Sequence, residues 1–390
     1  MTNVRFIYSE SAKGMEYQLT AQDYLFGGGI FITMVHALLL AAILFFNQRF
    51  STKANKYLAL AALGIAILLY YEFTGYTGVD QYIPWYIYEL PIYMVSAIPV
   101  GIFYYVLFLI QPDHQLQKWE RIGFWILAVN VFLDSLYLLI DGFIADETLN
   151  ETLNNYVYYG TYIYLIICAW YLLLQALKRV NQYQKFLYDN YSNPKENSLQ
   201  WLKTILLASL ALLIPFMVGL ILELTDQDIA SEVAYVLMTT GMMILLFWMG
   251  YAIILKYNWF EVVPYEVQAT EQKLSDKTQV YYEHLLQLIQ EEKLYQDANL
   301  NLNRLSEKLD ISSGYLSKII QEQEQKNFFE FINFYRVEAV KTKLSSNEYH
   351  HLTIMAIAEE SGFKSRSTFY TVFKKFTGQT PAAFRQAQGA

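Results

Sequence analysis

The chain has 390 residues, of which 55% are hydrophobic, 17% aromatic and only 16% charged, and its formal net charge at pH 7 is −8. This composition is too apolar and too poor in charge for an ordinary soluble multidomain protein. The single cysteine, Cys168, excludes an internal disulfide and a cysteine-based zinc or redox site. We therefore expect at least two regions that fold in different solvents.

Seven apolar stretches are long enough to cross a bilayer as helices: 24–46, 57–75, 85–110, 122–143, 156–177, 201–224 and 233–255. A span needs roughly 17 to 25 mainly apolar residues. No short apolar segment with a small-residue cleavage site precedes them, so we expect no removable signal peptide. The pattern predicts an all-α, seven-helix transmembrane bundle in residues 1–256. The alternative is a soluble bundle with unusually long core helices.

Basic residues in alternate loops predict how these spans are oriented. Lys and Arg follow the first, third and fifth stretches, whereas the other loops carry carboxylates and neither Lys nor Arg. The positive-inside rule then places the N-terminus outside and the chain after Lys256 in the cytoplasm. We therefore expect a multi-pass protein of the bacterial cytoplasmic (inner) membrane, with the lipid bilayer as a partner.

Polar side chains inside the spans are candidates for a sensing site, because such groups are costly in a bilayer. Asp134 lies near the middle of the fourth span, with Asn130 four residues earlier on the same helical face. Glu89 with Pro91 suggests a helix broken around a cavity, and His36 is a further candidate. A structural hydrogen bond from Asp134 to a neighbouring helix and an ordinary proline kink are the alternatives. Three carboxylates near outer span ends we interpret as wetted: Glu72, Asp141 and Glu223.

After Lys256 the composition changes to shorter, charged and amphipathic segments. Pro264 should interrupt any helix that continues from the last span. Apolar residues at helical spacing in 274–294 then predict an amphipathic helix, which packs either on the domain behind it or on a second copy of itself. We assign residues 257–297 to this linker and helix, and residues 298–390 to the domain that follows.

Two short helix pairs with helix-turn-helix spacing are predicted in that domain. The first runs LNRLSEKL (302–309), a turn at 310–312, then SGYLSKIIQEQ; the second runs TIMAIAEES (353–361), a turn at 362–363, then SRSTFYTVFKKF. Between them NFFEFINFYRVEAVKTKL predicts one longer helix. Residues 361–390 carry five basic side chains and no acidic one, a segregation that favours contact with DNA phosphates.

These motifs resemble the C-terminal DNA-binding domain of the AraC/XylS family of bacterial regulators. The resemblance covers roughly residues 300–385 and rests above all on IAEESGFKSRSTFYTVFKKFTGQTPAAFR. It implies two helix-turn-helix units joined by a long helix, with two recognition helices in successive major grooves, about 34 Å apart. In that family the sensory half is more often a soluble domain, so the resemblance says nothing about the predicted spans.

The recognition helices should be held by apolar residues at helical spacing and should read DNA with the others. The predicted DNA-binding residues are Gly314, Tyr315, Ser317, Lys318 and Gln321 in the first unit, and Ser365, Arg366, Ser367, Thr368, Tyr370, Thr371, Lys374 and Lys375 in the second. Arg366 can donate two hydrogen bonds to guanine, whereas Lys374 and Lys375 suit phosphates. The alternative is that these are merely solvated faces.

The resemblance also identifies base-reading positions, which match Gly314 and Lys318 in the first unit and Ser367 and Thr371 in the second. Gly314 and Thr371 are smaller than the side chains often found there. Specificity can then be modest or depend on DNA shape.

No metal-binding His pair, phosphate-binding loop, or Ser or Cys nucleophile with its base is recognisable, so we expect no enzyme, metal or cofactor. The sequence predicts a membrane-bound, sequence-specific transcription regulator that responds to an unknown small-molecule or envelope signal. Its expected partners are double-stranded promoter DNA, RNA polymerase and a second copy in a homodimer. Two alternatives stay open: a transporter or membrane enzyme with an appended DNA-binding reporter, and helix pairs that bind protein.

Overall fold

The computed structural model describes residues 21–48, 50, 52–79, 95–143, 147–194, 199–225, 227–256 and 278–388. These residues form α-helices and short 3-10 helices, and their only β-pairing is an isolated bridge between Tyr191 and Asn301. The all-α class is therefore confirmed. The chain divides into two compact units: Met1–Val180 with Leu199–Val262, and Asn181–Ser198 with Val263–Ala390.

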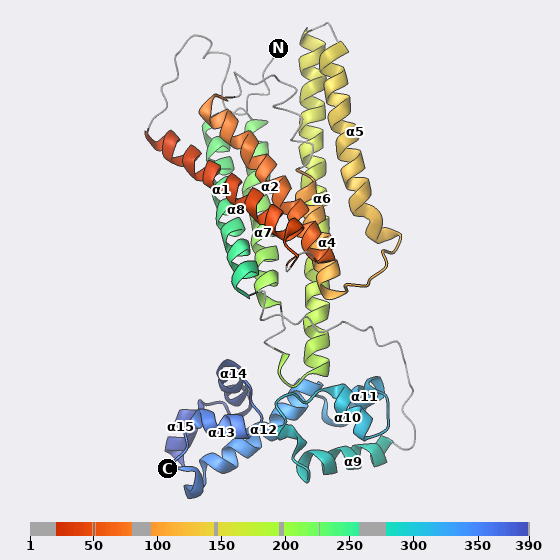
Figure 1. The fold of residues 1–390 in the computed structure, drawn as a ribbon, viewed down its shortest axis with the longest axis vertical. Helices are drawn as coiled ribbons and strands as arrows, with labels where there is room; N and C mark the ends of the chain where they lie inside the picture. The colour runs from red at the N-terminus through yellow and green to blue at the C-terminus, as the bar shows by residue number, and fades with distance from the viewer. Residues whose placement is uncertain are drawn as a thin grey trace. The chain divides into compact units, whose positions relative to one another are not determined.

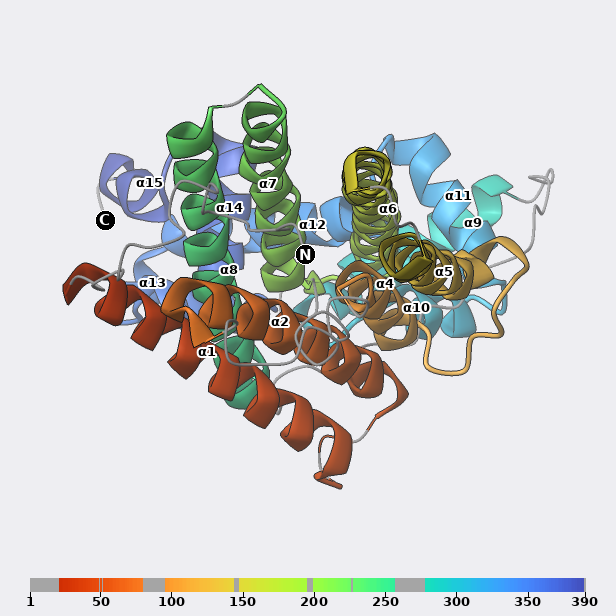
Figure 2. The same cartoon turned by 90° about the horizontal axis from the view of Figure 1, so that it is seen from above.

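The first unit is built from long helices (Figure 1): α1 (Ala21–Phe46), α2 (Lys53–Thr77), α4 (Ala97–Ile110), α5 (Ile122–Phe143), α6 (Glu147–Asn190), α7 (Gln200–Glu223) and α8 (Asp228–Lys256). Helix α1 packs on α2 and α8, α2 packs on α4, and α7 packs on α8, as the view from above also shows (Figure 2). Helix α6 extends beyond the predicted span 156–177, and its last ten residues belong to the second unit.

Five helices of the described residues are long and apolar enough to cross a bilayer: α1, α2, α6, α7 and α8. The fourth predicted span coincides with α5. Of the third, residues 95–110 are described, and they include the 14-residue helix α4, while Glu89 lies outside the described residues. The number of seven spans therefore stays a prediction.

Large apolar side chains remain exposed on the outer faces of these helices. Ile32 of α1 is 62% exposed, Phe132 of α5 is 64%, Ile167 of α6 is 63% and Ile244 of α8 is 63%. Single exposed apolar residues are ordinary, but such residues repeated on successive helices form a surface that is unfavourable in water. These faces require an apolar environment.

Helices α2 and α4 approach so closely that only a glycine fits between them. A Cβ atom at Gly101 would lie 2.5 Å from the carbonyl oxygen of Tyr57 and 2.9 Å from the Cβ of Ala61. Small residues at helix crossings allow this backbone contact, which is the usual source of helix association in membranes.

A buried carboxylate at the 3-10 helix η4 (Trp119–Arg121) ties the preceding loop to α6. Glu120 is fully buried; its Oε2 lies 2.7 Å from His114 Nε2, and Arg179 of α6 binds its Oε1. Burial raises the pKa of Glu120, but the backbone N–H of Gln117, His114 and Arg179 together hold it below its usual value. Helix α6 is thus anchored by an ion pair next to the unit boundary.

The second unit contains two helix pairs around α12 (Figures 1 and 2). Its helices are α9 (Thr278–Gln290), α10 (Leu302–Lys308), α11 (Ser313–Glu324), α12 (Phe328–Leu344), α13 (Ile354–Glu360), α14 (Arg366–Thr377) and α15 (Pro381–Ala387), with 3-10 helices η7 (Leu294–Gln296) and η8 (Asn347–Tyr349). One apolar core gathers α9, α10, α11 and the first half of α12, and the other gathers the second half of α12 with α13, α14 and α15. Helix α9 therefore packs on its own domain.

Each helix pair turns through a residue with positive φ. In the first turn Asp310 has φ 54°, which Asp tolerates better than most residues, and in the second Gly362 has φ 93°. A Cβ at Gly362 would lie 2.3 Å from the carbonyl oxygen of Tyr295. The predicted helix-turn-helix boundaries agree with these elements to within about two residues.

We expect Gly362→Ala to destabilise the C-terminal unit by more than about 2 kcal/mol, because it adds a clash with Tyr295 to the cost of a positive φ. Gly378→Ala is the matched control, since Gly378 also has a positive φ (76°) but open space around its Cβ position. Urea unfolding of the detergent-solubilised chain, followed by trypsin cleavage within residues 278–388, measures both. Equal losses of unfolding free energy in the two variants would contradict the close packing described at Gly362.

Candidate nucleic-acid interface

The recognition helices α11 and α14 each begin at a serine cap. Ser312 Oγ accepts a hydrogen bond from the backbone N–H of Tyr315 at 3.2 Å, and Ser365 Oγ accepts one from the N–H of Thr368 at 3.2 Å. A serine at this position satisfies an N–H that the helix itself leaves unpaired, which stabilises the helix start by about 1 kcal/mol.

The apolar positions expected to hold the recognition helices are buried. Side chains on α11 and α14 are at most 3% exposed at Leu316, Ile319, Ile320, Phe369, Val372 and Phe373. This prediction is confirmed, and it fixes which face of each helix remains accessible.

Helix α14 presents most of its predicted DNA-binding residues to solvent: Arg366, Ser367, Thr371, Lys374 and Lys375 are exposed, and Tyr370 is half-buried. The Arg366 guanidinium lies 5.4 Å from the centroid of the Tyr370 ring. Lys375 Nζ lies 2.6 Å from a carboxylate oxygen of Glu330 on α12, whereas Lys374 makes no ion pair with a described residue. Lys374 and Arg366 are therefore the more available cations of this helix.

Helix α11 presents a smaller set. Lys318 and Gln321 are exposed, and Gly314 and Ser317 are half-buried. The helix also carries Glu322 and Glu324, whereas α14 carries no acidic residue. We therefore expect weaker attraction to phosphates at the first helix-turn-helix pair (α10 and α11) than at the second (α13 and α14).

Helix α11 is also tied to α9 through Glu324. The Tyr282 hydroxyl donates a hydrogen bond to the Glu324 carboxylate, and Lys326 Nζ lies 2.9 Å from it. Burial raises the pKa of Glu324, but these two partners hold it below its usual value. Its negative charge is therefore retained and locally compensated.

Two predicted DNA-binding residues are buried, which corrects the prediction that they face the groove. Tyr315 is 6% exposed; its ring packs edge-on against Tyr281, and its hydroxyl lies 3.1 Å from Thr278 Oγ1. Thr368 is 2% exposed and accepts a hydrogen bond from the hydroxyl of Ser365. Both lie in the first turn, on the side that faces the neighbouring helices, so Ser365 and Thr368 serve the helix start.

Arg385 was counted among the basic residues of the C-terminal segment, but the structure gives it a structural role. Its guanidinium donates hydrogen bonds to the carbonyl oxygens of Leu352 (3.0 Å), Tyr349 and His350 (2.8 Å). The residue closes the loop before α13.

The residue that sequence reasoning missed is Arg336 on α12, which is fully buried. It donates to the carbonyl oxygens of Tyr295 (2.7 Å) and Asp297 (2.9 Å), and to the carbonyl and hydroxyl oxygens of Ser192 (3.3 and 3.0 Å). Burial lowers the pKa of Arg336 to about 9, so the guanidinium remains charged at neutral pH. An arginine on an otherwise apolar helix face was the available signal.

The polar residues predicted inside the spans lie in different surroundings. Asn130 is buried and lines a partly open cavity. His36 is half-buried with its ring stacked 4.6 Å from that of Phe247, and it does not line the cavity. Asp134 lies on α5, but its side chain, like all of Glu89, lies outside what the structure describes.

Comparison with known proteins concerns the C-terminal segment. Residues 305–387 match the family model described as a helix-turn-helix domain. An uncharacterized HTH-type transcriptional regulator of Staphylococcus aureus (strain COL) is 38% identical over 93 residues, 24% of this chain and 12% of that protein. The melibiose operon regulatory protein of Escherichia coli (strain K12) is 29% identical over 29% of this chain and 35% of that protein.

Among solved structures, the C-terminal domain of a two-component response regulator from Fusobacterium nucleatum is 32% identical, with 28% of this chain and 99% of that chain covered and a TM-score of 0.24. The chain thus spans only 12% and 35% of the lengths of the two regulators described above. The sequence matches confirm the family resemblance expected for the C-terminal segment.

We expect Arg366→Ala to reduce discrimination between selected and random DNA by about 1–3 kcal/mol, because it removes a candidate guanine contact. Lys374→Ala should instead weaken binding to all sequences and lower the slope of log K against log salt by about 0.9, the value for one lost phosphate contact. Fluorescence anisotropy at several salt concentrations, with DNA enriched by the wild-type chain, measures both.

The matched control is Lys293→Asn, which removes an exposed charge outside both recognition helices at a residue with φ 53°, a conformation that Asn tolerates. This variant should keep both the discrimination and the salt slope. If all three variants behaved alike, only net charge would matter, and the assignment of α14 as a DNA-reading helix would be wrong.

Proposed function

Because residues 305–387 are an AraC-type helix-turn-helix domain, we propose that the chain as a whole is a membrane-bound, sequence-specific transcription regulator. Its membrane helices sense a signal, and this signal controls how the two recognition helices engage promoter DNA. The proposal places the domain in the cytoplasm, on the side of the loops rich in Lys and Arg. Five apolar helices and the exposed apolar faces of the first unit support the membrane location.

The observation that carries this proposal is the path of helix α6. Its apolar stretch begins at Tyr159 within the first unit, and the same helix continues to Asn190, inside the second unit. A helix of 44 residues is about 66 Å long, at 1.5 Å per residue, and thus longer than a bilayer is thick. One continuous element can therefore carry a displacement from the membrane to the helix-turn-helix unit.

The last turn of α6 and the residues directly after it are bound firmly within the second unit. Ser192 is fully buried, and its carbonyl oxygen accepts hydrogen bonds from Asn333 Nδ2 (3.2 Å) and Arg336 Nη1 (3.3 Å). The Ser192 hydroxyl donates to the carbonyl oxygen of Leu300 at 2.7 Å, and the Tyr188 ring packs edge-on against Phe329 at 5.1 Å. Hydrogen bonds to a charged group contribute about 1.5–3 kcal/mol each, so releasing this segment is costly.

These contacts lie on the helix that joins the two DNA-binding units. Phe329, Asn333 and Arg336 all belong to α12, and the α10–α11 pair packs at its start while the α13–α14 pair packs at its end. A signal that stabilises one position of α6 over another would shift the spacing of the recognition helices. Such control requires a ligand with different affinity for the two arrangements.

A second copy of the chain is not required by this mechanism. The apolar stripe of α9 that suggested a homodimer is used within the chain, because Leu285, Leu288 and Ile289 are buried in the first core of the domain. The two recognition helices of one chain suffice for two neighbouring major grooves.

We expect the double variant Tyr188→Ala, Ser192→Leu to change promoter occupancy by about fivefold or more, because typical coupling energies are about 1–3 kcal/mol. Genome-wide crosslinking and sequencing of bound DNA in the native host measures occupancy, with the amount of protein in the membrane fraction measured in parallel. The matched control is Gln182→Ala, an exposed residue on the same stretch of α6.

The proposal fails if the double variant and the wild type occupy the same sites equally at equal abundance. It also fails if the wild-type protein is absent from the membrane fraction. Discrete sites that are lost only when α14 is altered, with unchanged occupancy in the α6 variant, would support DNA binding without membrane control.

A further inference from the structure

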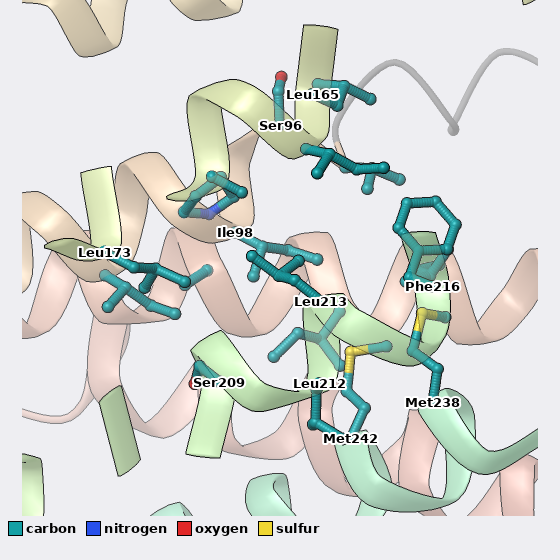
Figure 3. Close-up of a pocket in the computed structure, with 18 of the residues that line it drawn as sticks. Ser96, Ile98, Leu165, Leu173, Ser209, Leu212, Leu213, Phe216, Met238 and Met242 are labelled. Atoms are coloured by element: carbon teal, nitrogen blue, oxygen red, sulfur yellow. The ribbon is translucent and has the colours of Figure 1, made fainter. Parts of the chain in front are cut away.

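A partly open cavity of about 270 Å³ lies among the helices of the first unit. It is lined by α2, α4, α6, α7 and α8 with one residue of α5, and Figure 3 shows part of its apolar wall, with Leu173 of α6, Phe216 of α7 and Met242 of α8. The volume is close to the lower end of the range of about 300–1,000 Å³ typical of small-molecule sites. The cavity therefore suits a small, mainly apolar ligand.

One carboxylate, that of Glu72 on α2, lines this apolar cavity. Within the part of the chain that the structure describes, it has no hydrogen-bond or ion-pair partner. The sequence suggested a wetted residue near a span end, whereas the structure surrounds it with residues such as Ile65 and Leu68. A carboxylate in such surroundings is costly unless a partner compensates its charge.

A second polar group in the wall is also without a partner. Ser96 is 1% exposed and lines the cavity, and its Oγ has no hydrogen-bond partner among the described residues. Ser96 is the N-cap of α4, where a serine normally binds a backbone N–H, but it makes no such capping bond. Figure 3 shows this side chain in the wall of the cavity. Its hydroxyl is therefore a buried polar group at the cavity wall whose hydrogen bond is not supplied by a described residue.

The charges around the cavity decide the class of the ligand's polar group. The N-terminus of α4 contributes about half a positive charge, whereas an ionised Glu72 carboxylate contributes a full negative charge, so a cation that keeps Glu72 ionised is favoured. We propose that this cavity binds a small apolar amine, whose ammonium group donates hydrogen bonds to the Glu72 carboxylate and the Ser96 hydroxyl. Its hydrocarbon part packs against the Leu, Phe and Met side chains.

This inference rests on the proposed function, because it names the chemical class of the signal. Helix α6 contributes Leu165, Ala169 and Leu173 to the cavity wall, and the same helix continues to the segment that Arg336 binds. An occupant that stabilises one position of α6 would therefore act on the DNA-binding unit.

The test uses the full chain in lipid nanodiscs at pH 7, with 2-phenylethylamine as the probe and 2-phenylethanol as its neutral counterpart of nearly the same shape. Isothermal titration calorimetry should show the amine binding about tenfold more tightly than the alcohol. Glu72→Gln should abolish this preference, and Ser96→Ala should weaken amine binding about threefold. Glu232→Gln is the matched control, since Glu232 is a half-buried carboxylate of α8 that does not line the cavity, and it should change nothing.

Equal affinity of the wild-type chain for the amine and the alcohol overturns the proposal, and this comparison needs no variant. A Glu72→Gln chain that keeps the preference also overturns it, and Glu72→Asp, which keeps the charge, guards against a general folding defect. The titration contains no DNA, so it can succeed while the proposed function fails. In that case the amine binds with the expected dependence on Glu72, but neither the amine nor the α6 variant changes promoter occupancy.

Discussion

The C-terminal unit depends on the hydrogen bonds that the guanidinium of Arg336 donates. It is fully buried, and among the described residues no carboxylate lies at hydrogen-bond distance from it, so its direct partners are the carbonyl oxygens of Tyr295, Asp297 and Ser192. A buried charge that loses such partners is strongly destabilising. The carbonyls come from two segments far apart in the sequence, one at Ser192 and one at Tyr295 and Asp297, and the same side chain binds both. Gly362 must be a glycine partly for this reason, because a Cβ there would lie 2.8 Å from Arg336 Nε.

That interaction joins the segment that follows α6 to α12, the helix between the two helix-turn-helix pairs. AraC-type recognition needs two helices at a defined spacing, and the spacing is set by α12. Because α12 also holds Ser192 through Asn333 and Arg336, the end of α6 becomes part of the scaffold that sets the spacing. The ion pair of Arg179 with Glu120 holds α6 within the first unit, thirteen residues before Ser192.

We expect the two helix-turn-helix pairs to contribute unequally to DNA binding. Helix α14 carries Arg366, Lys374 and Lys375 with no acidic residue, whereas α11 balances Lys318 with Glu322 and Glu324. Nonspecific attraction to phosphates grows with the number of uncompensated cations, and although Lys375 is paired with Glu330, Arg366 and Lys374 still favour the second helix-turn-helix pair. The first helix-turn-helix pair packs against α9 through Tyr315, and Leu300 just before it accepts a hydrogen bond from Ser192, two residues after the end of α6. This pair is therefore better placed to respond to the rest of the chain.

The sequence by itself determined the elements whose signal is local. Helical periodicity and turn residues gave the four helices of the two helix pairs, their buried faces at Leu316 and Phe369, and the apolar segments that became α1, α2, α6, α7 and α8. Only the tertiary structure decided the rest, because it depends on contacts between distant segments. In the structure Tyr315 and Thr368 are buried, and Arg385 and Arg336 donate hydrogen bonds to carbonyl oxygens. Glu72 and Ser96 line the same cavity. Periodicity identifies the face of a helix, but it does not identify what packs against that face, and a long-range contact between Ser192 and Arg336 leaves no local pattern in the sequence.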